Sequence, residues 1–404
     1  MNSETLHYVR QHADDDVRQL ALRGCKDPQV DLRWALDQIA GRQTARKKLP
    51  SWAAIDDIHY PPHLSMEQCS SETTACYKAL LARRLLLQRE SMADLTGGFG
   101  VDCSFLAREF KRAVYVEQQE HLCLAAQHNF QLLGLQATEV VCANATDYLP
   151  RLSHTSLIFL DPARRDANGQ RTYSISDCTP DVLTMLSELL SKCDVLLLKL
   201  SPMLDWRKAV ADLGTEHVAE IHIVSVQGEC KELLIVLRPE TSQDIVVFCV
   251  DDGSCYTFTE GEPPSSQQSQ HALSMSSSPL REPYAGDCLY EPNASVMKAG
   301  CFSSLQQQFA MTQIAPNSHL FLSASPQEDF PGRAFRIKTM TTMNKRDLRN
   351  ALNGITQANI SVRNFPLSVA DLRKRLRLSD GGDTYIFATT LSDARHVLFI
   401  CEKQ

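Results

Sequence analysis

Short apolar runs that end on polar residues recur through the middle of the chain, with helical patterns between them. Four such runs, each followed by its polar end, are the run before Asp94, residues 113–116 before Glu117, residues 139–142 before 143–147, and residues 157–160 before Asp161. Alternation of short apolar runs with helices predicts βαβ units and a parallel sheet. Because ligands bind outside the carboxyl ends of parallel strands, we expect the polar residues to gather at one edge.

The pattern closes with a hairpin. Residues 195–200 form a further apolar run, and the runs 218–226 and 233–237 are joined directly by the turn at 228–232. Counting from Asp94 gives seven strands, of which the last two have no helix between them. We therefore predict a Rossmann-like α/β domain over residues 91–240 with a seven-stranded sheet.

The flanking regions have different patterns. Residues 1–90 carry apolar positions at helical spacing and predict an N-terminal helical domain. Residues 241–330 predict a small α+β subdomain, in which the Ser/Gln/Pro-rich segment 261–283 has too few apolar residues for a core and is expected to be a flexible loop. Residues 331–404 alternate strands with two helices and predict a further α+β domain.

The turn from Asp94 to Gly100 carries the first candidate chemistry. Glycine has no Cβ, so Gly98 and Gly100 let the backbone approach a ligand closely. A dinucleotide fingerprint requires a third glycine where Cys103 stands, and a phosphate-binding P-loop requires a G-K-S/T that does not follow. The remaining pattern is D-x-x-x-G-x-G. An oxidoreductase is thereby disfavoured.

The charge of the whole chain is acidic, but one region of it is basic. The 404 residues include 43% hydrophobic and 22% charged residues, with a net charge of −7, so the chain as a whole has no basic field. The C-terminal part nevertheless gathers cations, which on charge alone fit contact with a nucleic-acid backbone or a solvated helix face. These cations are Arg333, Arg336, Lys338, Lys345, Arg346, Arg349, Arg363, Arg373, Lys374, Arg375 and Arg377.

The remaining composition bears on the cell compartment. The fourteen cysteines are scattered without a C-x-x-C, and no secretory leader is apparent, so we expect reduced thiols in a cytoplasmic protein. Neither a membrane span nor a metal site is expected, because no apolar run is long enough and His and Cys do not cluster at ligand spacing.

Several strings together resemble one family. They are 94–102, Asp161-Pro162-Ala163-Arg164-Arg165, 198–205, 229–233, 290–294 and 363–367. In combination they are similar to bacterial class I methyltransferases with a C-terminal THUMP-like domain. The resemblance implies S-adenosyl-L-methionine (AdoMet) as cofactor, a ferredoxin-like subdomain at 241–330, a THUMP-like domain at 331–404, and RNA (tRNA or rRNA) as substrate bound through the basic C-terminal region.

The resemblance also implies roles for residues. Glu117 would accept hydrogen bonds from the ribose hydroxyls, and Asn144 would face the adenine amino group, with Asp147 as the fallback. The expected cofactor-binding residues are Asp94, Thr96, Gly98, Gly100, Asp102, Glu117, Asn144, Ala145 and Asp161. The expected catalytic residues are Asp161, Pro162, Arg164 and Lys199.

The acceptor of the methyl group is indicated by the string at 161–165. Enzymes that methylate exocyclic amines usually have Asp/Asn-Pro-Pro and an aromatic residue there, whereas this chain has Ala163 and Arg164. Uracil-C5 enzymes need a cysteine that Lys199-Leu200-Ser201-Pro202 does not supply. Asp161 can still accept a hydrogen bond from an amino group, and the guanidinium of Arg164 can stack on a base or hold a phosphate. We therefore favour an exocyclic amine of an RNA base. A small-molecule or protein methyltransferase and a nonenzymatic RNA-binding protein stay open.

Overall fold

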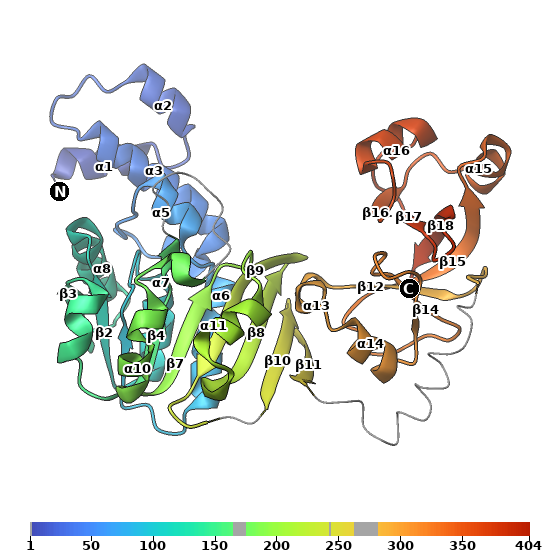
Figure 1. Cartoon of the computed structure of the whole chain (residues 1–404). Helices are drawn as coiled ribbons and strands as arrows, with labels where there is room; N and C mark the ends of the chain where they lie inside the picture. Colours follow the sequence, from blue (N-terminus) through green and yellow to red (C-terminus); the bar gives the residue numbers. More distant parts are fainter. Residues whose placement is uncertain (1, 165–174, 242–243, 262–281) are drawn as a thin grey trace. The chain divides into compact units, whose positions relative to one another are not determined.

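The computed structural model describes residues 2–164, 175–241, 244–261 and 282–404 (Figure 1). The chain divides into two compact units, Met1–Ile221 with Lys231–Gln243, and His222–Cys230 with Asp244–Gln404. The predicted flexible loop 261–283 and Arg165 fall almost wholly outside the described residues. In the described ranges no helix has both the length and the apolar character needed to span a bilayer.

Helices fill the first unit up to residue 85, as the spacing of apolar residues predicts. They are α1 (Ser3–Gln11), α2 (Val17–Arg23), α3 (Leu32–Lys48), α4 (Pro50–Ala53), α5 (His63–Gln68) and α6 (Glu72–Leu85). Ser71 caps α6 by accepting a hydrogen bond from the backbone N–H of Thr74. Ser71 thus has the N-cap role that is typical of serine at the start of a helix.

A twisted sheet forms the body of the first unit. It belongs to a nine-stranded sheet in which the seven predicted strands run in the order β8-β9-β7-β4-β1-β2-β3, a further hairpin lies beside β8, and β9 is antiparallel to β7. Their bounds are β1 (Ser91–Asp94), β2 (Arg112–Glu117), β3 (Thr138–Cys142), β4 (Thr155–Leu160), β7 (Cys193–Leu200), β8 (Val218–Val226) and β9 (Glu229–Leu237). The predicted Rossmann-like sheet with a closing antiparallel strand is confirmed.

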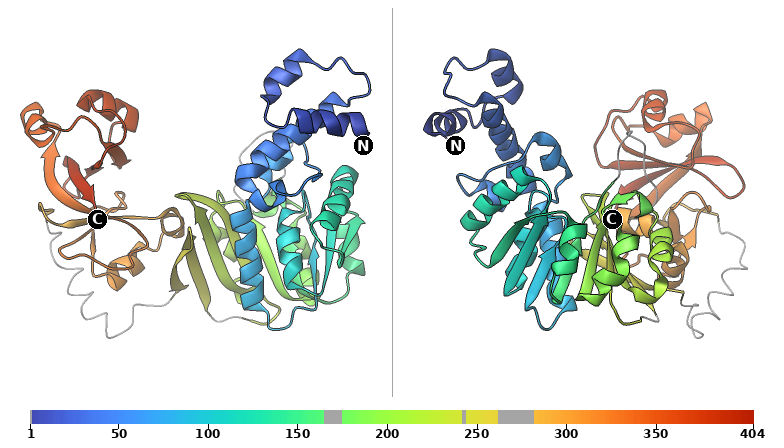
Figure 2. Two further views of the ribbon diagram at one scale, coloured as in Figure 1. Left: turned by 180° about the vertical axis from the view of Figure 1, so that it is seen from behind. Right: turned by 60° about the vertical axis from the view of Figure 1, so that its left-hand side comes forward.

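Helices cover both faces of this sheet. The connecting helices are α7 (Val101–Leu106), α8 (Glu120–Leu132), α9 (Ala145–Tyr148), α10 (Val182–Ser191) and α11 (Trp206–Leu213). α10 and α11 lie on one face, whereas α6 lies on the other, where the rear view brings it to the front (Figures 1 and 2). Because β4 and β7 are covered on both sides, nearly all their residues are buried, which explains their unbroken apolar sequences.

The second unit contains a hairpin and a separate sheet. The hairpin β10 (Ile245–Asp251) and β11 (Ser254–Glu260) continues from the end of β8, where Ser225 Oγ donates to the carbonyl of Val250 at 3.0 Å. The separate sheet has the order β13-β14-β12-β15-β18-β17-β16. Its strands are β12 (Cys288–Pro292), β13 (Thr312–Gln313), β14 (Phe321–Ser323), β15 (Gly332–Thr342), β16 (Asn359–Arg363), β17 (Thr384–Thr390) and β18 (His396–Lys403).

The separate sheet buries apolar side chains on both faces because its strands alternate. Phe387 and Phe399 point to one face, and Ile386 and Leu398 point to the other. The second face is covered by α15 (Lys345–Ala351) and α16 (Val369–Leu376), whereas α13 (Ala294–Ala299) and α14 (Phe302–Gln308) follow β12. α15 and α16 also carry most of the exposed cations.

Glu291 is the buried charge of this sheet. Its side chain is 4% exposed and accepts from Arg333 on β15 and from Arg363 on β16, at 2.9 Å in the second case. Arg333 and Arg363, two of the eleven cations counted in the sequence, therefore stabilise the fold. The deeply buried carboxylate of Glu291 needs both of them to balance its charge.

We expect Glu291→Ala to lower the free energy of unfolding of the second unit by about 3 kcal/mol, since removing one partner leaves buried charge unpaired. The measurement is denaturant unfolding. Glu402→Ala is the matched control, because Glu402 is half-exposed and pairs with Lys338 at 2.8 Å, and such a surface pair contributes about 0.5 kcal/mol. Equal effects of the two substitutions would contradict a structural role for Glu291.

Candidate functional site

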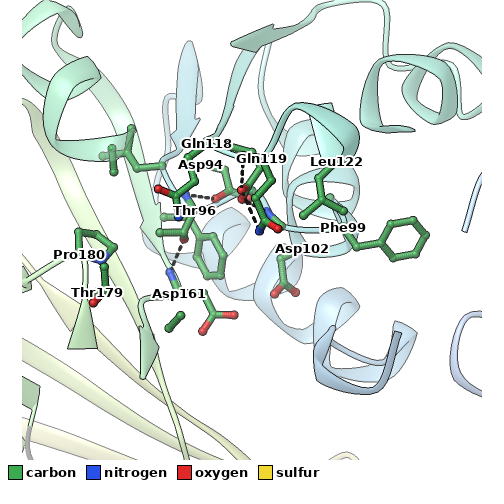
Figure 3. A pocket seen from close by; sticks show the side chains of 18 of the residues that line it. Asp94, Thr96, Phe99, Asp102, Gln118, Gln119, Leu122, Asp161, Thr179 and Pro180 are labelled. Atoms are coloured by element: carbon green, nitrogen blue, oxygen red, sulfur yellow. Dashed lines mark hydrogen bonds between the residues drawn. The ribbon is translucent and has the colours of Figure 1, made fainter. Parts of the chain in front are cut away.

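The site is a pocket of about 470 Å³ at the carboxyl ends of the strands of the first unit (Figure 3). One wall is formed by the glycine-rich turn after β1, the end of β2 and the segment after β3. The other wall is formed by residues from the segment before α6, the end of β4, the start of α10 and the end of β7. The convergence that the sequence predicted for the strand ends therefore occurs.

The glycine-rich turn is held by β2. The backbone N–H of Gly97 donates to the carbonyl of Val116 at 2.9 Å, and the N–H of Gly98 donates to Glu117 Oε2 at 2.9 Å. Tyr115 donates from its hydroxyl to the carbonyl of Gly98. Gly98 and Gly100 have φ of +53° and +84°, the region where glycine carries no steric penalty.

Glu117 presents its carboxylate at the pocket wall. Besides accepting from Gly98, its Oε1 accepts from the backbone N–H of Gln119 at 2.9 Å. The residue is 8% exposed, so the carboxylate is fixed before any ligand arrives. Its remaining acceptor capacity is available to a ligand that offers hydroxyl donors.

Asp94 and Thr96 connect the turn to the strand β4. Asp94 is buried and accepts from the N–H of Thr96 at 3.0 Å, and burial raises the pKa of its carboxyl well above its ordinary value. Thr96 Oγ1 accepts from the backbone N–H of Asp161 at 2.6 Å. Both residues line the pocket, but their hydrogen bonds also position the neighbouring backbone.

Asn144 is placed differently from the expectation. Its side-chain oxygen accepts from the N–H and the hydroxyl of Thr146 at 2.9 and 2.8 Å, so it caps α9, and its amide nitrogen donates to Gln118. The oxygen that was expected to face adenine is thus occupied. Ala145 also lines the pocket, whereas the fallback Asp147 does not.

The chain just after β4 brings the predicted catalytic residue Asp161 into the pocket. Asp161 lines the pocket, and its side chain is 37% exposed. Pro162 is buried and is not part of the lining. Arg164 lies in the short strand β5 (Ala163–Arg164), and its side chain is outside the described part of the structure, so its predicted contact with a base stays a prediction.

Lys199, at the end of β7, joins Asp161 to Asp102. Its Nζ lies 2.5 Å from Asp161 Oδ2 and 3.3 Å from Asp102 Oδ2. Burial alone would lower the pKa of Lys199, but Asp161, Asp102 and Glu232 together raise it well above its ordinary value. Lys199 therefore carries a positive charge at neutral pH, next to the part of the pocket where Asp102 and Asp161 direct their carboxylates (Figure 3).

Behind Lys199 and Asp102 lie polar groups that were not predicted from the sequence. Lys78 on α6 is fully buried, and its Nζ lies 3.1 Å from Asp102 Oδ1 and 2.6 Å from Glu232 Oε2 on β9. Ser70 donates to Asp102 Oδ2 at 2.7 Å. Burial would raise the pKa of Asp102, but Lys78, Lys199 and Ser70 lower it, so Asp102 is ionised.

A signal for these groups was present in the sequence. Lys78 falls among Ala75, Ala79 and Ala82 on the buried stripe of α6, and Glu232 directly precedes the apolar run of β9. A lone charge in an apolar stripe must find a partner when it is buried. Which partner it finds depends on the tertiary fold.

Metal ligands are not grouped in the described residues, where no cluster of three His, Cys, Asp or Glu side chains is suited to hold an ion. Cys103 in α7 and Cys123 in α8 are buried. The cysteines of the described residues form no disulfides.

Together, the sheet order, the antiparallel β9 and the pocket at the glycine-rich turn define a class I methyltransferase fold. Family models match a ferredoxin-like domain at residues 289–331 and a THUMP domain-like region at 332–403. A crystal structure of a proposed methyltransferase from Porphyromonas gingivalis W83 is 30% identical, covers 99% of this chain and 97% of its own, and has a TM-score of 0.84. The chain belongs to this family of class I methyltransferases with a C-terminal THUMP-like domain.

Other similar structures are distant. A proposed methyltransferase from Streptococcus mutans in complex with SAH is 14% identical over 41% of this chain and 96% of its own, with a TM-score of 0.32. An O-methyltransferase from Bacillus cereus in complex with SAH is 16% identical over 51% of this chain and 98% of its own, with a TM-score of 0.34. No curated protein is similar enough to count as a match.

The glycine-rich turn gives a direct test of the geometry. A Cβ on Gly97 would lie 2.1 Å from Cε2 of the fully buried Tyr115, whereas a Cβ on Gly98 would have its nearest heavy atom, the carbonyl oxygen of Thr96, at 3.8 Å. We expect Gly97→Ala to destabilise the protein by about 3 kcal/mol through overpacking and Gly98→Ala by about 1 kcal/mol through its positive φ. Denaturant unfolding of both variants is the measurement, and the reverse order would show that the turn has another conformation.

Proposed function

We propose that the protein transfers a methyl group from AdoMet to RNA. The main support for AdoMet as the cofactor is the carboxylate of Glu117, which is fixed at the pocket wall beside a turn of three glycines. A carboxylate only accepts hydrogen bonds, so it suits the two hydroxyls of a ribose. Membership of a methyltransferase family supports the same assignment.

The residue types of the pocket suit the chemical groups of AdoMet. Glu117 would hold the ribose hydroxyls, Gly98 and Gly100 would leave room for the cofactor beside the backbone, and Ala145 would line the adenine side. When bound, the cofactor supplies a methyl group that is activated by a sulfonium. The protein has to exclude water and place the acceptor in line with that methyl group, and such positioning lowers the barrier substantially.

RNA as the substrate rests on the THUMP-like match and on exposed cations of the second unit. α15 and α16 pack on the same face of the sheet and leave cations at their surfaces. Arg373 is tied to Asp380 at 2.7 Å, so this arginine, which the sequence places among the RNA-binding cations, is committed in part to the fold. The other cations of α15, α16 and the C-cap of α16 are exposed, and they are Lys345, Arg346, Arg349, Lys374, Arg375 and Arg377.

For the cofactor, we expect Glu117→Ala to weaken AdoMet binding by roughly 2 to 4 kcal/mol, from two hydrogen bonds to a charged acceptor less what water restores. Titration calorimetry is the measurement. Glu120→Ala is the control, because Glu120 is an exposed carboxylate at the start of α8 that does not line the pocket. Unchanged affinity in Glu117→Ala, or preference for NAD, would refute the cofactor assignment.

For RNA, we expect the double variant Lys374→Glu, Arg375→Glu to bind RNA more weakly and with a flatter dependence on salt. The slope of log K against log salt should fall by about 0.7 for each phosphate of a single strand that the variant no longer neutralises. AdoMet affinity should stay the same. RNA affinity across a salt series is the measurement.

The control for this experiment reverses two cations of the first unit. Lys111 precedes β2 and Arg151 precedes β4, so both lie toward the amino ends of the strands, and both are exposed. Lys111→Glu, Arg151→Glu should leave the salt slope unchanged. If the Lys374, Arg375 variant keeps the wild-type slope and methylation rate, α16 does not bind the RNA, and methylation of a small molecule or a protein takes its place.

A further inference from the structure

Five charged side chains form a continuous line from the interior of the first unit into the pocket. Glu232, Lys78, Asp102, Lys199 and Asp161 alternate in sign, and the successive ion-pair distances are 2.6, 3.1, 3.3 and 2.5 Å. They come from β9, α6, α7, β7 and the end of β4. The fold therefore brings five distant parts of the sequence together to place one ammonium group, that of Lys199, beside Asp161.

The exposure of the line falls from the pocket inward. The side chain of Asp161 is 37% exposed, those of Lys199 and Asp102 are 11% and 9% exposed, and Lys78 is fully buried. Only Asp161, Lys199 and Asp102 line the pocket. A bound acceptor can thus contact Asp161 and Lys199, whereas Lys78 and Glu232 act through them.

An ammonium next to the acceptor discriminates between kinds of nucleophile. A neutral amine that attacks a methyl sulfonium gains positive charge on its nitrogen, and a neighbouring ammonium disfavours that charge. A hydroxyl that attacks must lose its proton, and negative charge develops on its oxygen. An ammonium stabilises that oxygen, and an adjacent carboxylate can take the proton.

We propose that the acceptor is a hydroxyl group and, since the proposal rests on RNA as the substrate, that it is the ribose 2′-hydroxyl. Asp161 accepts the proton as the O–H bond breaks, and Lys199 stabilises the developing charge on the oxygen. The oxygen forms a bond to the methyl carbon as the carbon–sulfur bond breaks, and the electron pair of that bond stays on the sulfur, which becomes a neutral thioether. Asp161 then releases the proton to solvent.

The inner part of the line has a positioning role. Asp102 is shared by Lys78 and Lys199, and it holds the ammonium of Lys199 toward Asp161 from behind. Lys78 keeps Asp102 ionised, and Glu232 balances the charge of Lys78, which no solvent reaches. The exocyclic amine that the sequence favoured follows from the Asp-Pro string alone, without the lysine that the fold places beside it.

The first experiment identifies the product of the wild-type protein. The full-length protein is incubated with methyl-labelled AdoMet and total RNA from a strain in which its gene is deleted, and the RNA is digested and analysed by mass spectrometry. We expect the label on ribose, in dinucleotides that resist alkaline cleavage because the 2′-oxygen is blocked. Label on a base would overturn the hydroxyl acceptor and leave RNA methylation intact. Absence of label from all RNA would overturn both proposals.

The second experiment tests the role of Lys199. Lys199→Met should lower kcat by about 100-fold or more, as expected for loss of a group that stabilises charge on the attacking oxygen, and leave AdoMet affinity within about threefold. Its rate should rise with pH, because without the ammonium the reaction proceeds mainly through the small fraction of acceptor whose hydroxyl is already ionised. A pH-independent rate in this variant would overturn the proposal.

Lys111→Met is the matched control for the second experiment. Lys111 is 72% exposed and pairs with Glu90 at 2.7 Å, outside the pocket, so its removal should leave kcat and the pH profile as in the wild type. Thermal unfolding of both variants separates a loss of chemistry from a loss of fold. The product analysis of the wild type needs neither variant and decides the acceptor by itself.

Discussion

The buried ion pair between Lys78 and Glu232 is the constraint on which the site depends. A fully buried ammonium is tolerated only when carboxylates surround it, because taking an unpaired charge out of water is strongly unfavourable. Lys78 meets Glu232 and Asp102 from two directions, and this fixes α6 against β9 and α7 at one point. Removing any one partner would leave an uncompensated charge in the core, so the line of charges is stable only when it is complete.

This constraint explains why the pocket is organised before a ligand binds. Asp102 accepts a hydrogen bond from Ser70 and forms ion pairs with Lys78 and Lys199. Asp161 forms an ion pair with Lys199, and its backbone N–H donates to Thr96. Electrostatic groups that are already oriented need not reorganise when charge develops during a reaction. At the glycine-rich turn, the fixed carboxylate of Glu117 has the same property.

The sequence predicted the sheet well because its signals are local. Apolar runs that end on polar residues mark the strands, and the direct link between 218–226 and 233–237 marks the closing antiparallel strand. The same locality limited the site. Asn144 could be found after β3, but the choice of its oxygen to cap α9 depends on Thr146, and the meeting of Lys78 with Glu232, 154 residues apart, depends on tertiary packing.

The line of charges also bears on how the chain is divided. A boundary at residue 90 separates a helical domain from the catalytic sheet, yet Ser70 and Lys78 precede that boundary and contact Asp102. Residues 1–221 lie in a single compact unit. The buried carboxylate of Glu232 on β9 pairs with Lys78 of α6. Without α6, this carboxylate would either stay in the core without a partner or become exposed to water. α6 therefore packs as part of the same compact unit as the sheet and supplies the lysine that holds Asp102 in place.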